Sequence, residues 1–281
     1  NISQLSFWHG KPEINNLLDL NNVWPYYMKF HYKADYRGHF DKQGIPMLNY
    51  HGKIGLQYNP IAISQYGLGN YNLYIDTKEY SRLKNFINIS DWLVENLTAN
   101  KHGVQVWHHH FDFEYRSLLK SPWYSGLAQG LGISVLLRAY KETKKKKYLD
   151  AYYQAWPSMI KKIDEGGVVY IDDDGDYWIE EYIVNPPTHI LNGFIWALFG
   201  VYDSWKYLNN KSAEKLFHGC IATLIKNINK YDTGYWSLYE QSGTLLPMVA
   251  SPFYHQLHMV QLIILYNLSG KIIFKEYADK W

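Results

Sequence analysis

An internal repeat constrains the fold of this chain more than any other feature of its sequence. Apolar patterns at helical spacing end near four tyrosines, 66, 62 and 64 residues apart: Tyr74, Tyr140, Tyr202 and Tyr266. A short polar turn follows each pattern, at residues 75–78, 141–144, 203–206 and 267–270. A second amphipathic segment follows each turn, at residues 80–97, 148–163, 213–228 and, in shortened form, 273–281. The repeating unit is therefore predicted to be a helix hairpin.

The length of the repeat predicts how the hairpins are connected. Repeated helix pairs bury a core that neighbours share. Here the period is longer than in ordinary helical solenoids, because an insert separates each pair from the next. Helical α/α toroids have this organisation, with the active site where the inserts meet the mouth of the barrel. We therefore expect a mainly α fold in which residues 59–281 form the barrel and residues 1–58, a mixture of loops and short strands, pack on it.

The first helix of the second repeat contains several glycines. Its apolar residues keep a helical period from Leu127 to Ala139, yet Gly126, Gly130 and Gly132 lie in the same segment. A glycine inside a helix costs about 1 kcal/mol relative to alanine. We therefore expect another backbone to pack closely against this helix.

The insert after the second hairpin has the pattern of a β-hairpin. Two segments rich in β-branched and aromatic residues, 166–171 and 176–182, flank Asp172–Asp173–Asp174–Gly175. An Asp-Gly pair between such segments is typical of a tight turn. The aspartates could bind Ca²⁺, but their spacing does not match a calcium loop, so we interpret them as a turn. Residues 232–239 of the next insert have the same hairpin character.

Composition limits the class of protein. The chain has 281 residues, of which 47% are hydrophobic, enough for a sizeable buried core. No apolar stretch reaches 18 residues, so no membrane span is expected. The net charge of +2 does not indicate a nucleic-acid partner, and Cys220, the only cysteine, excludes an internal disulfide. The Lys-, Asn- and Ile-rich composition suggests an AT-rich genome. We expect a soluble protein of the bacterial cytoplasm or cell envelope.

Aromatic residues are abundant, at 17% of the chain, with 27 Tyr and 11 Trp. An aromatic ring can stack on the C–H face of a sugar while its polar edge makes hydrogen bonds. The surplus therefore favours a carbohydrate cleft, although aromatic packing between helices would give the same composition.

Acid and base groups gather at the end of the predicted hairpin, in Glu180–Glu181–Tyr182, shortly before Asn192–Gly193–Phe194. No nucleophile–histidine pair, phosphate-binding loop or cysteine cage accompanies them. This favours proton chemistry on a neutral or acidic substrate such as a sugar. Strand alternation would send Glu181 and Tyr182 to opposite faces unless the strand twists or bulges at its end. In the other interpretation, Glu181 is an exposed hairpin carboxylate and Tyr182 belongs to the core.

Three helices are predicted to begin with polar residues at the barrel mouth. In the first of these helices, Ser251–Pro252 precedes Tyr254, His255, His258 and Gln261. In the second, Ser121–Pro122 is expected to start the helix with Trp123 and Tyr124 in its first turn, followed by Gln129. In the third, Asn59–Pro60 precedes Gln65 and Tyr66. Polar residues that open an otherwise apolar helix are typical of helices that begin at a cleft.

Histidines at two places could suggest a metal, but their pattern does not support one. In the run from His108 to His110, strand alternation separates His109 from the other two, which suits residues that line or cap a cleft. His255 and His258 have no third ligand at a suitable spacing. We expect no metal and no cofactor.

Four of these segments, in this order and with their internal spacings, resemble the D-glucuronyl C5-epimerase family. They are residues 60–68, 121–130, 180–182 with 191–194, and 254–262. The resemblance covers about Gly44 to Trp281. It implies an incomplete (α/α) barrel of about four helix hairpins with β-hairpin inserts at the cleft, and separate β-rich domains that are reduced or absent here. The family acts on glucuronic acid in heparosan and heparan sulfate precursors.

The resemblance also implies roles for particular residues. The catalytic groups fall on Glu181, Tyr182, Tyr239 and Tyr254. The expected substrate-binding residues are Gln65, Tyr66, Trp123, Tyr124, Gln129, Asn192, His255, His258 and Arg116. Two arginines that bind acidic groups in the family are replaced here by Ser242 and Ser251. His255, His258 or Arg116 could hold the carboxylate in their place.

The expected activity is conversion of D-glucuronate to L-iduronate in a heparosan-like polymer. C5 would lose its proton on one face and regain one on the other, with Glu181 and Tyr254 as the opposed pair. The partner would be an acidic polysaccharide, and a homodimer is compatible with the family. Other interpretations stay open: a β-eliminating uronate lyase, a glycoside hydrolase that pairs Glu181 with Glu240 or Asp112, and a polysaccharide-binding protein without catalysis.

Overall fold

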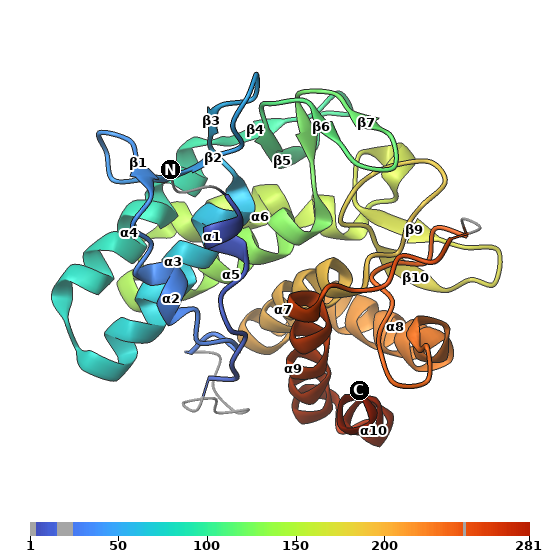
Figure 1. Ribbon diagram of the computed structural model, residues 1–281. Helices are drawn as coiled ribbons and strands as arrows, with labels where there is room; N and C mark the ends of the chain where they lie inside the picture. The colour runs from blue at the N-terminus through green and yellow to red at the C-terminus, as the bar shows by residue number, and fades with distance from the viewer. Residues whose placement is uncertain (1–3, 16–24, 244–245) are drawn as a thin grey trace.

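Four helix hairpins make up most of the computed structural model, which describes residues 4–15, 25–243 and 246–281 (Figure 1). The hairpins are α3 (Pro60–Thr77) with α4 (Tyr80–Glu95), α5 (Gly126–Thr143) with α6 (Lys146–Ile160), α7 (Leu191–Leu208) with α8 (Lys211–Asn227), and α9 (Pro252–Ser269) with α10 (Ile272–Lys280). The predicted repeat of helix hairpins is confirmed. None of the described helices is both long and apolar enough to cross a membrane.

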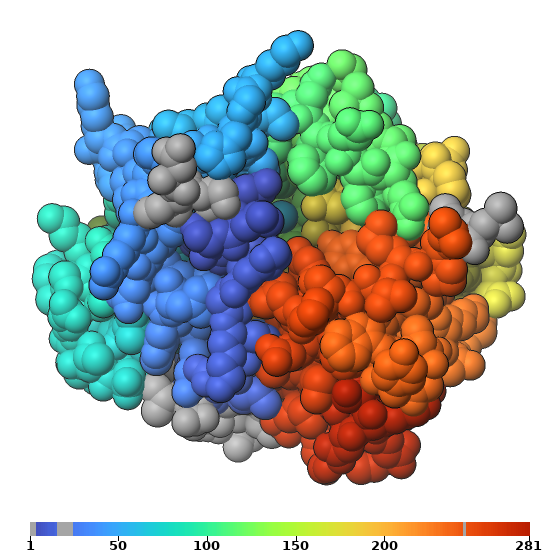
Figure 2. Space-filling model, in the orientation of Figure 1, coloured from blue at the N-terminus to red at the C-terminus, as the bar shows by residue number. Residues whose placement is uncertain are grey.

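The helices form an inner and an outer row. In the inner row α3 packs against α5, α5 against α7 and α7 against α9, while in the outer row α4 packs against α6 and α6 against α8. Helices α5 and α7 are buried along almost their whole length, whereas α4, α6 and α8 bury one face. The N-terminal segment lies between the two ends of the inner row, where the His9 ring contacts Phe253 and α2 (His31–Ala34) packs on α3 (Figures 1 and 2). The fold is the expected incomplete (α/α) barrel.

The repeat arises from the way each inner helix ends. A residue in the left-handed conformation follows each one: Lys78, Lys144, Asn209 and Gly270. This conformation breaks the helix and turns the chain back into the outer helix. In three of the four hairpins the backbone N–H of that residue donates to the carbonyl of the repeated tyrosine four positions earlier, at Tyr74, Tyr140 and Tyr266.

The expected turns start too early, because α3, α5 and α9 continue to Thr77, Thr143 and Ser269. The turn expected at residues 203–206 is wrong altogether, because α7 continues to Leu208. Asp203 looks like a turn residue in the sequence, but it is fully buried and forms an ion pair with Arg138 of α5, with Nη1 2.5 Å from Oδ2. The Tyr27 hydroxyl donates to the same carboxylate at 2.6 Å, and Arg138 donates to the carbonyl of Pro25 at 3.1 Å. This buried cluster joins α5, α7 and the N-terminal segment.

Glycines allow α5 and α7 to pack backbone to backbone, as expected. A Cβ atom added at Gly130 would lie 2.5 Å from Cα of Ala197, and one added at Gly200 would lie 2.2 Å from the carbonyl oxygen of Gly130. No side chain fits there, so the close contact offsets the helix-propensity cost of these glycines.

Short antiparallel sheets lie at one end of the helices (Figure 1). Their strands are β1 (His39–Phe40), β2 (Pro46–Asn49) and β3 (Leu56–Gln57); β4 (Leu97–Ala99), β5 (Gln105–His109) and β8 (Trp123–Tyr124); β6 (Phe113–Glu114) and β7 (Leu118–Leu119); and β9 (Val169–Ile171) and β10 (Tyr177–Ile179). One buried cluster contains Phe7, Tyr27 and Ile45 together with residues of the helix hairpins. The boundary at residue 58 therefore separates two parts of the sequence but not two cores.

The helix expected to start at Ser121 or Pro122 starts later. Trp123 and Tyr124 form strand β8, which pairs with β5, and α5 begins at Gly126 after the N-cap Ser125. The indole Nε1 of Trp123 donates to the Phe111 carbonyl at 2.8 Å, and its ring stacks on His109 at 3.8 Å between centroids. These contacts hold Trp123 in the sheet.

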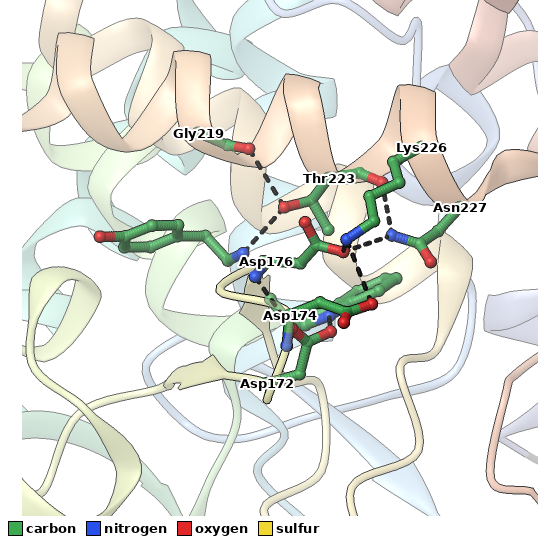
Figure 3. Close-up of polar contacts among 9 residues, drawn as sticks. Asp172, Asp174, Asp176, Gly219, Thr223, Lys226 and Asn227 are labelled. Carbon is green, nitrogen blue, oxygen red and sulfur yellow. Dashed lines mark hydrogen bonds and ion pairs between the residues drawn. The ribbon is translucent and has the colours of Figure 1, made fainter.

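The β9–β10 hairpin has the expected turn, and Asp172, Asp174 and Asp176 have protein partners (Figure 3). Asp172 accepts hydrogen bonds from the backbone of Asp174 and Asp176 and from the Trp178 indole. Asp174 and Asp176 both form ion pairs with Lys226 of α8, at 3.2 and 2.9 Å. The turn therefore fixes the hairpin to the outer row of helices.

Candidate active site

A cavity of about 270 Å³ lies where the inserts meet the inner helices. This volume is close to the lower end of the range for ligand pockets, roughly 300 Å³. Its walls come from the N-terminal segment, the starts of α3, α7 and α9, the β5–β8 region and the residues after β10. Six of the predicted site residues line it: Gln65, Trp123, Glu181, Tyr182, Asn192 and Tyr254.

Glu181 and Tyr182 both reach this cavity because the strand stops before them. Strand β10 ends at Ile179, so the alternation of side chains no longer applies to the following residues. Glu180 points elsewhere: it is fully buried and pairs with His189 Nδ1 at 2.5 Å. Its carboxylate also accepts the backbone N–H of His189, which fixes the segment that leads into α7.

The first turn of α7 leaves room for the Glu181 side chain. A Cβ atom at Gly193 would lie 2.1 Å from Oε2 of Glu181 and 2.6 Å from its Cβ. Only 4% of Glu181 is exposed, and its Oε2 has no hydrogen-bond partner in the part of the chain that the structure describes. Burial raises the pKa of Glu181 to about 8, and the nearby Glu180 charge acts in the same direction. A hydrogen bond from Tyr182 lowers the pKa and offsets part of this effect.

Three tyrosines surround this carboxyl group. The rings of Tyr239 and Tyr254 lie edge to face, 4.8 Å apart, and the Tyr182 ring lies 4.6 Å from that of Tyr115. Burial raises the pKa of Tyr182, Tyr239 and Tyr254, and the Glu181 charge raises each further. The phenols are therefore protonated at neutral pH and can act as proton donors. Tyr239 does not line the cavity itself but contacts it through Tyr254.

Buried polar atoms of the cavity lack partners. Among the described residues, Gln65 Oε1 and Asn192 Oδ1, like Glu181 Oε2, accept no hydrogen bond although they are buried. An unsatisfied buried acceptor costs free energy. Three such acceptors around one cavity are suited to the hydroxyl groups of a sugar.

Six of the predicted substrate-binding residues are not part of the cavity lining: Tyr66, Tyr124, Gln129, His255, His258 and Arg116. Gln129 makes two hydrogen bonds to the backbone of Trp107, at 3.1 and 3.2 Å, and joins α5 to β5. His255 stacks on Trp236 at 3.7 Å and bonds to Ser237, whose hydroxyl also contacts His258 Nδ1 at 2.8 Å. Tyr66 packs on Phe40. The two histidines therefore hold the segment that carries Tyr239.

Arg116 also lies away from the cavity lining. Its guanidinium forms an ion pair with Glu240, whose side chain is fully buried, and Nε donates to the same carboxylate at 2.9 Å. Tyr115 donates to Glu240 as well. That Arg116, His255 or His258 holds a substrate carboxylate stays a prediction. None of the three lines the cavity, although His258 Nε2 is buried without a hydrogen-bond partner among the described residues.

The histidine run divides as strand alternation predicts. His109 is buried against Trp123, whereas His108 and His110 line a second cavity together with Tyr124. Trp123 belongs to the walls of both cavities. Within residues 4–15, 25–243 and 246–281, no three His, Cys, Asp or Glu side chains gather as a metal site would require.

The N-terminal segment contributes cavity residues that the sequence did not predict, among them His9, Tyr32, Lys33 and Tyr50. They follow no helical or strand period, so pattern reasoning could not place them. The position of Tyr50 could have been found from Asn59, which begins a helix that the sequence predicts to start at the cleft. The side-chain amide of Asn59, the N-cap of α3, donates to the Tyr50 hydroxyl at 2.7 Å.

The fold places the chain among the α/α toroids. Similar solved structures include a sugar epimerase from a ruminal bacterium, with 13% identity, 99% of this chain, 82% of that chain and a TM-score of 0.57. A family 76 glycoside hydrolase from a bovine Bacteroides thetaiotaomicron strain is 13% identical, with a TM-score of 0.54, over 76% of this chain and 44% of that chain. The unsaturated glucuronyl hydrolase of Bacillus sp. GL1 is 14% identical, with a TM-score of 0.51, over 78% of this chain and 60% of that chain. At these identities the likeness concerns the fold alone.

The sequence pattern of the D-glucuronyl C5-epimerase C-terminus matches residues 100–281, and the chain belongs to this family. A D-glucuronyl C5-epimerase of Caenorhabditis elegans is 29% identical over 211 residues, which are 70% of this chain and 34% of that protein. An uncharacterized protein of Methanocaldococcus jannaschii is 30% identical over 179 residues, 63% of this chain and 56% of that one. The chain thus spans about a third and about half of the length of these curated relatives.

Proposed function

We propose that the chain is a uronate C5-epimerase that converts D-glucuronate to L-iduronate residues in a heparosan-like polymer. The observation that carries this proposal is Glu181: a buried carboxyl group with an unpartnered oxygen, a pKa near 8 and a cavity in front of it. Catalytic bases work best when their pKa lies near the working pH.

The proposed reaction needs two groups on opposite faces of the sugar ring. Deprotonated Glu181 removes the C5 proton, and the neutral phenol of Tyr254 returns a proton from the other side. Burial is the dominant effect on Tyr254 and raises its pKa. A hydrogen bond from Tyr239 lowers that pKa and so supports the role of Tyr254 as a proton donor. Tyr182 donates a hydrogen bond to Glu181 and so keeps the carboxylate oriented.

The hydrolase interpretation has less support in the site. A hydrolase needs a second carboxyl group across the scissile bond, roughly 5–10 Å away. Glu240 is occupied by Arg116 and Tyr115, and Asp112 is 46% exposed and pairs with Lys120; neither lines the cavity. Among the described residues, Glu13 is the other carboxylate besides Glu181 that lines the cavity, and it pairs with Lys11 and Lys29.

Product analysis after incubation with desulfated heparosan tests the proposal. An epimerase leaves the chain intact and creates iduronate residues. An unsaturated, ultraviolet-absorbing end would identify a lyase, and new reducing ends would identify a hydrolase. A polymer that is bound but unchanged would identify a binding protein, and each of these three results would contradict the proposal.

A further inference from the structure

A buried lysine faces the same cavity and has no anionic partner. Lys33, in α2, is 3% exposed and lines the cavity wall formed by the N-terminal segment. Its ammonium group donates one hydrogen bond, to the carbonyl of Phe7 at 3.0 Å. No carboxylate of the described residues lies within ion-pair distance of it. Because an ammonium has three donors, two of them are available to a ligand.

Aromatic rings fix the position of this ammonium. It lies 4.3 Å from the ring centroid of Phe7, 5.0 Å from Tyr32, 5.2 Å from Trp8 and 5.6 Å from Phe30. Ring faces attract a cation, so this arrangement holds the charge without neutralising it. Burial lowers the pKa of Lys33 well below its usual value, and an incoming anion would oppose that effect.

His9 connects Lys33 to the proposed catalytic groups. Burial and then the Lys33 charge lower the pKa of His9, so the two side chains are neighbours. The His9 ring lies 6.3 Å from that of Tyr254, edge to face. The cation and the proposed proton donor therefore belong to one site.

We infer that Lys33 binds the carboxylate of the uronate ring and stabilises the negative charge that accumulates there when C5 loses its proton. A buried cation without a counterion is unfavourable unless a ligand supplies the charge. Below pH 8 the protonated Glu181 carboxyl is neutral and does not repel a second carboxylate in the cavity. Lys33 thus takes the place of the family arginines that Ser242 and Ser251 replace.

This inference rests on the proposed function for the reaction, but its test does not require turnover. The affinities of heparosan oligosaccharides and of the same oligosaccharides with their carboxyl groups reduced to alcohols are compared by isothermal titration calorimetry. The wild-type protein is expected to prefer the carboxylate form. In Lys33→Met that preference should fall about 10- to 100-fold, as for the loss of one hydrogen bond to a charged group.

Two further variants separate charge from packing. Lys33→Arg keeps the cation and should retain part of the preference. Lys42→Met removes an exposed charge of the N-terminal segment outside the cavity and should retain all of it. If Lys33→Met does not fold, Lys33→Gln replaces it. An unchanged preference in either neutral variant, or no preference in the wild-type protein, would overturn the inference. Absence of iduronate with the preference intact would instead contradict the proposed function.

Discussion

The glycine beside the proposed base offers a sharp test of the site. In Gly193→Ala the new methyl group would lie 2.1 Å from Oε2 of Glu181, 2.6 Å from its Cβ and 2.7 Å from its Cδ. A Cβ atom essentially never lies within 3.0 Å of a non-bonded heavy atom, so the carboxylate oxygen must move by about 1 Å. Rotation of the side chain does not relieve the contact with Cβ, so the backbone of residues 180–182 has to move as well.

The expected loss of activity is larger than the expected loss of stability. A 1 Å displacement of a catalytic group costs roughly 100-fold in rate. Overpacking costs about 1–3 kcal/mol, and the better helix propensity of alanine returns about 1 kcal/mol of that. We therefore expect Gly193→Ala to fold, with kcat/KM for heparosan epimerisation reduced about 100-fold.

A matched variant in another helix controls for the substitution itself. A Cβ atom at Gly219 of α8 would lie 3.4 Å from the nearest atom of Tyr177, which is an ordinary contact. Gly219→Ala should raise the free energy of unfolding by about 0.5–1 kcal/mol and leave kcat/KM unchanged. If Gly193→Ala kept kcat/KM within about 3-fold of the wild-type value, the assignment of Glu181 as a positioned base would be refuted.

Four other predictions concern the same site and the buried core. The pH profile of kcat/KM should rise through about pH 8, because burial raises the pKa of Glu181 and only its deprotonated form accepts the C5 proton; a flat profile would argue against it. The pKa of Glu181 in the folded state lies above the ordinary 4.5, so the wild-type protein should lose stability as the pH rises from about 4.5 to 8. In urea unfolding, Glu181→Gln should therefore be more stable than the wild-type protein at pH 9, by up to roughly 5 kcal/mol, and equally stable at pH 4. Tyr254→Phe should exchange the C5 proton without forming iduronate, as NMR would show, and full epimerisation would exclude Tyr254 as the second group. Asp203→Ala should destabilise the fold by about 3–5 kcal/mol in denaturant titration, because Arg138 is left buried without its partner, whereas a double variant that replaces both with apolar residues should recover much of the loss.

The parts of this protein that sequence could predict are those with a regular pattern. The helix hairpins repeat because a left-handed residue ends each inner helix, and that signal is local. Glu181, Tyr254 and Asn192 could be assigned to a cleft because each lies at the end of a strand or the start of a helix, where inserts meet the barrel.

The parts that sequence could not predict depend on contacts between distant residues. Arg116 was expected at the substrate, but its partner Glu240 is 124 residues away and no local pattern indicates the pair. Lys33 reaches the cavity because the N-terminal segment lies between the ends of the inner row. Tyr254 and His258 lie on one helix face, as their spacing predicts. Only the fold shows that Tyr254 lines the cavity, whereas His258 lies outside the lining and contacts Ser237 in the segment that carries Tyr239.

The central claim is that Glu181 removes the C5 proton of a uronate, and solvent exchange tests it most directly. Desulfated heparosan is incubated with the protein in deuterated buffer, and C5 is observed by NMR. We expect deuterium at C5 in newly formed iduronate residues of an intact chain, and none with Glu181→Gln. Wild-type protein that leaves C5 fully protonated, or a Glu181→Gln variant that exchanges C5 at the wild-type rate, would contradict it.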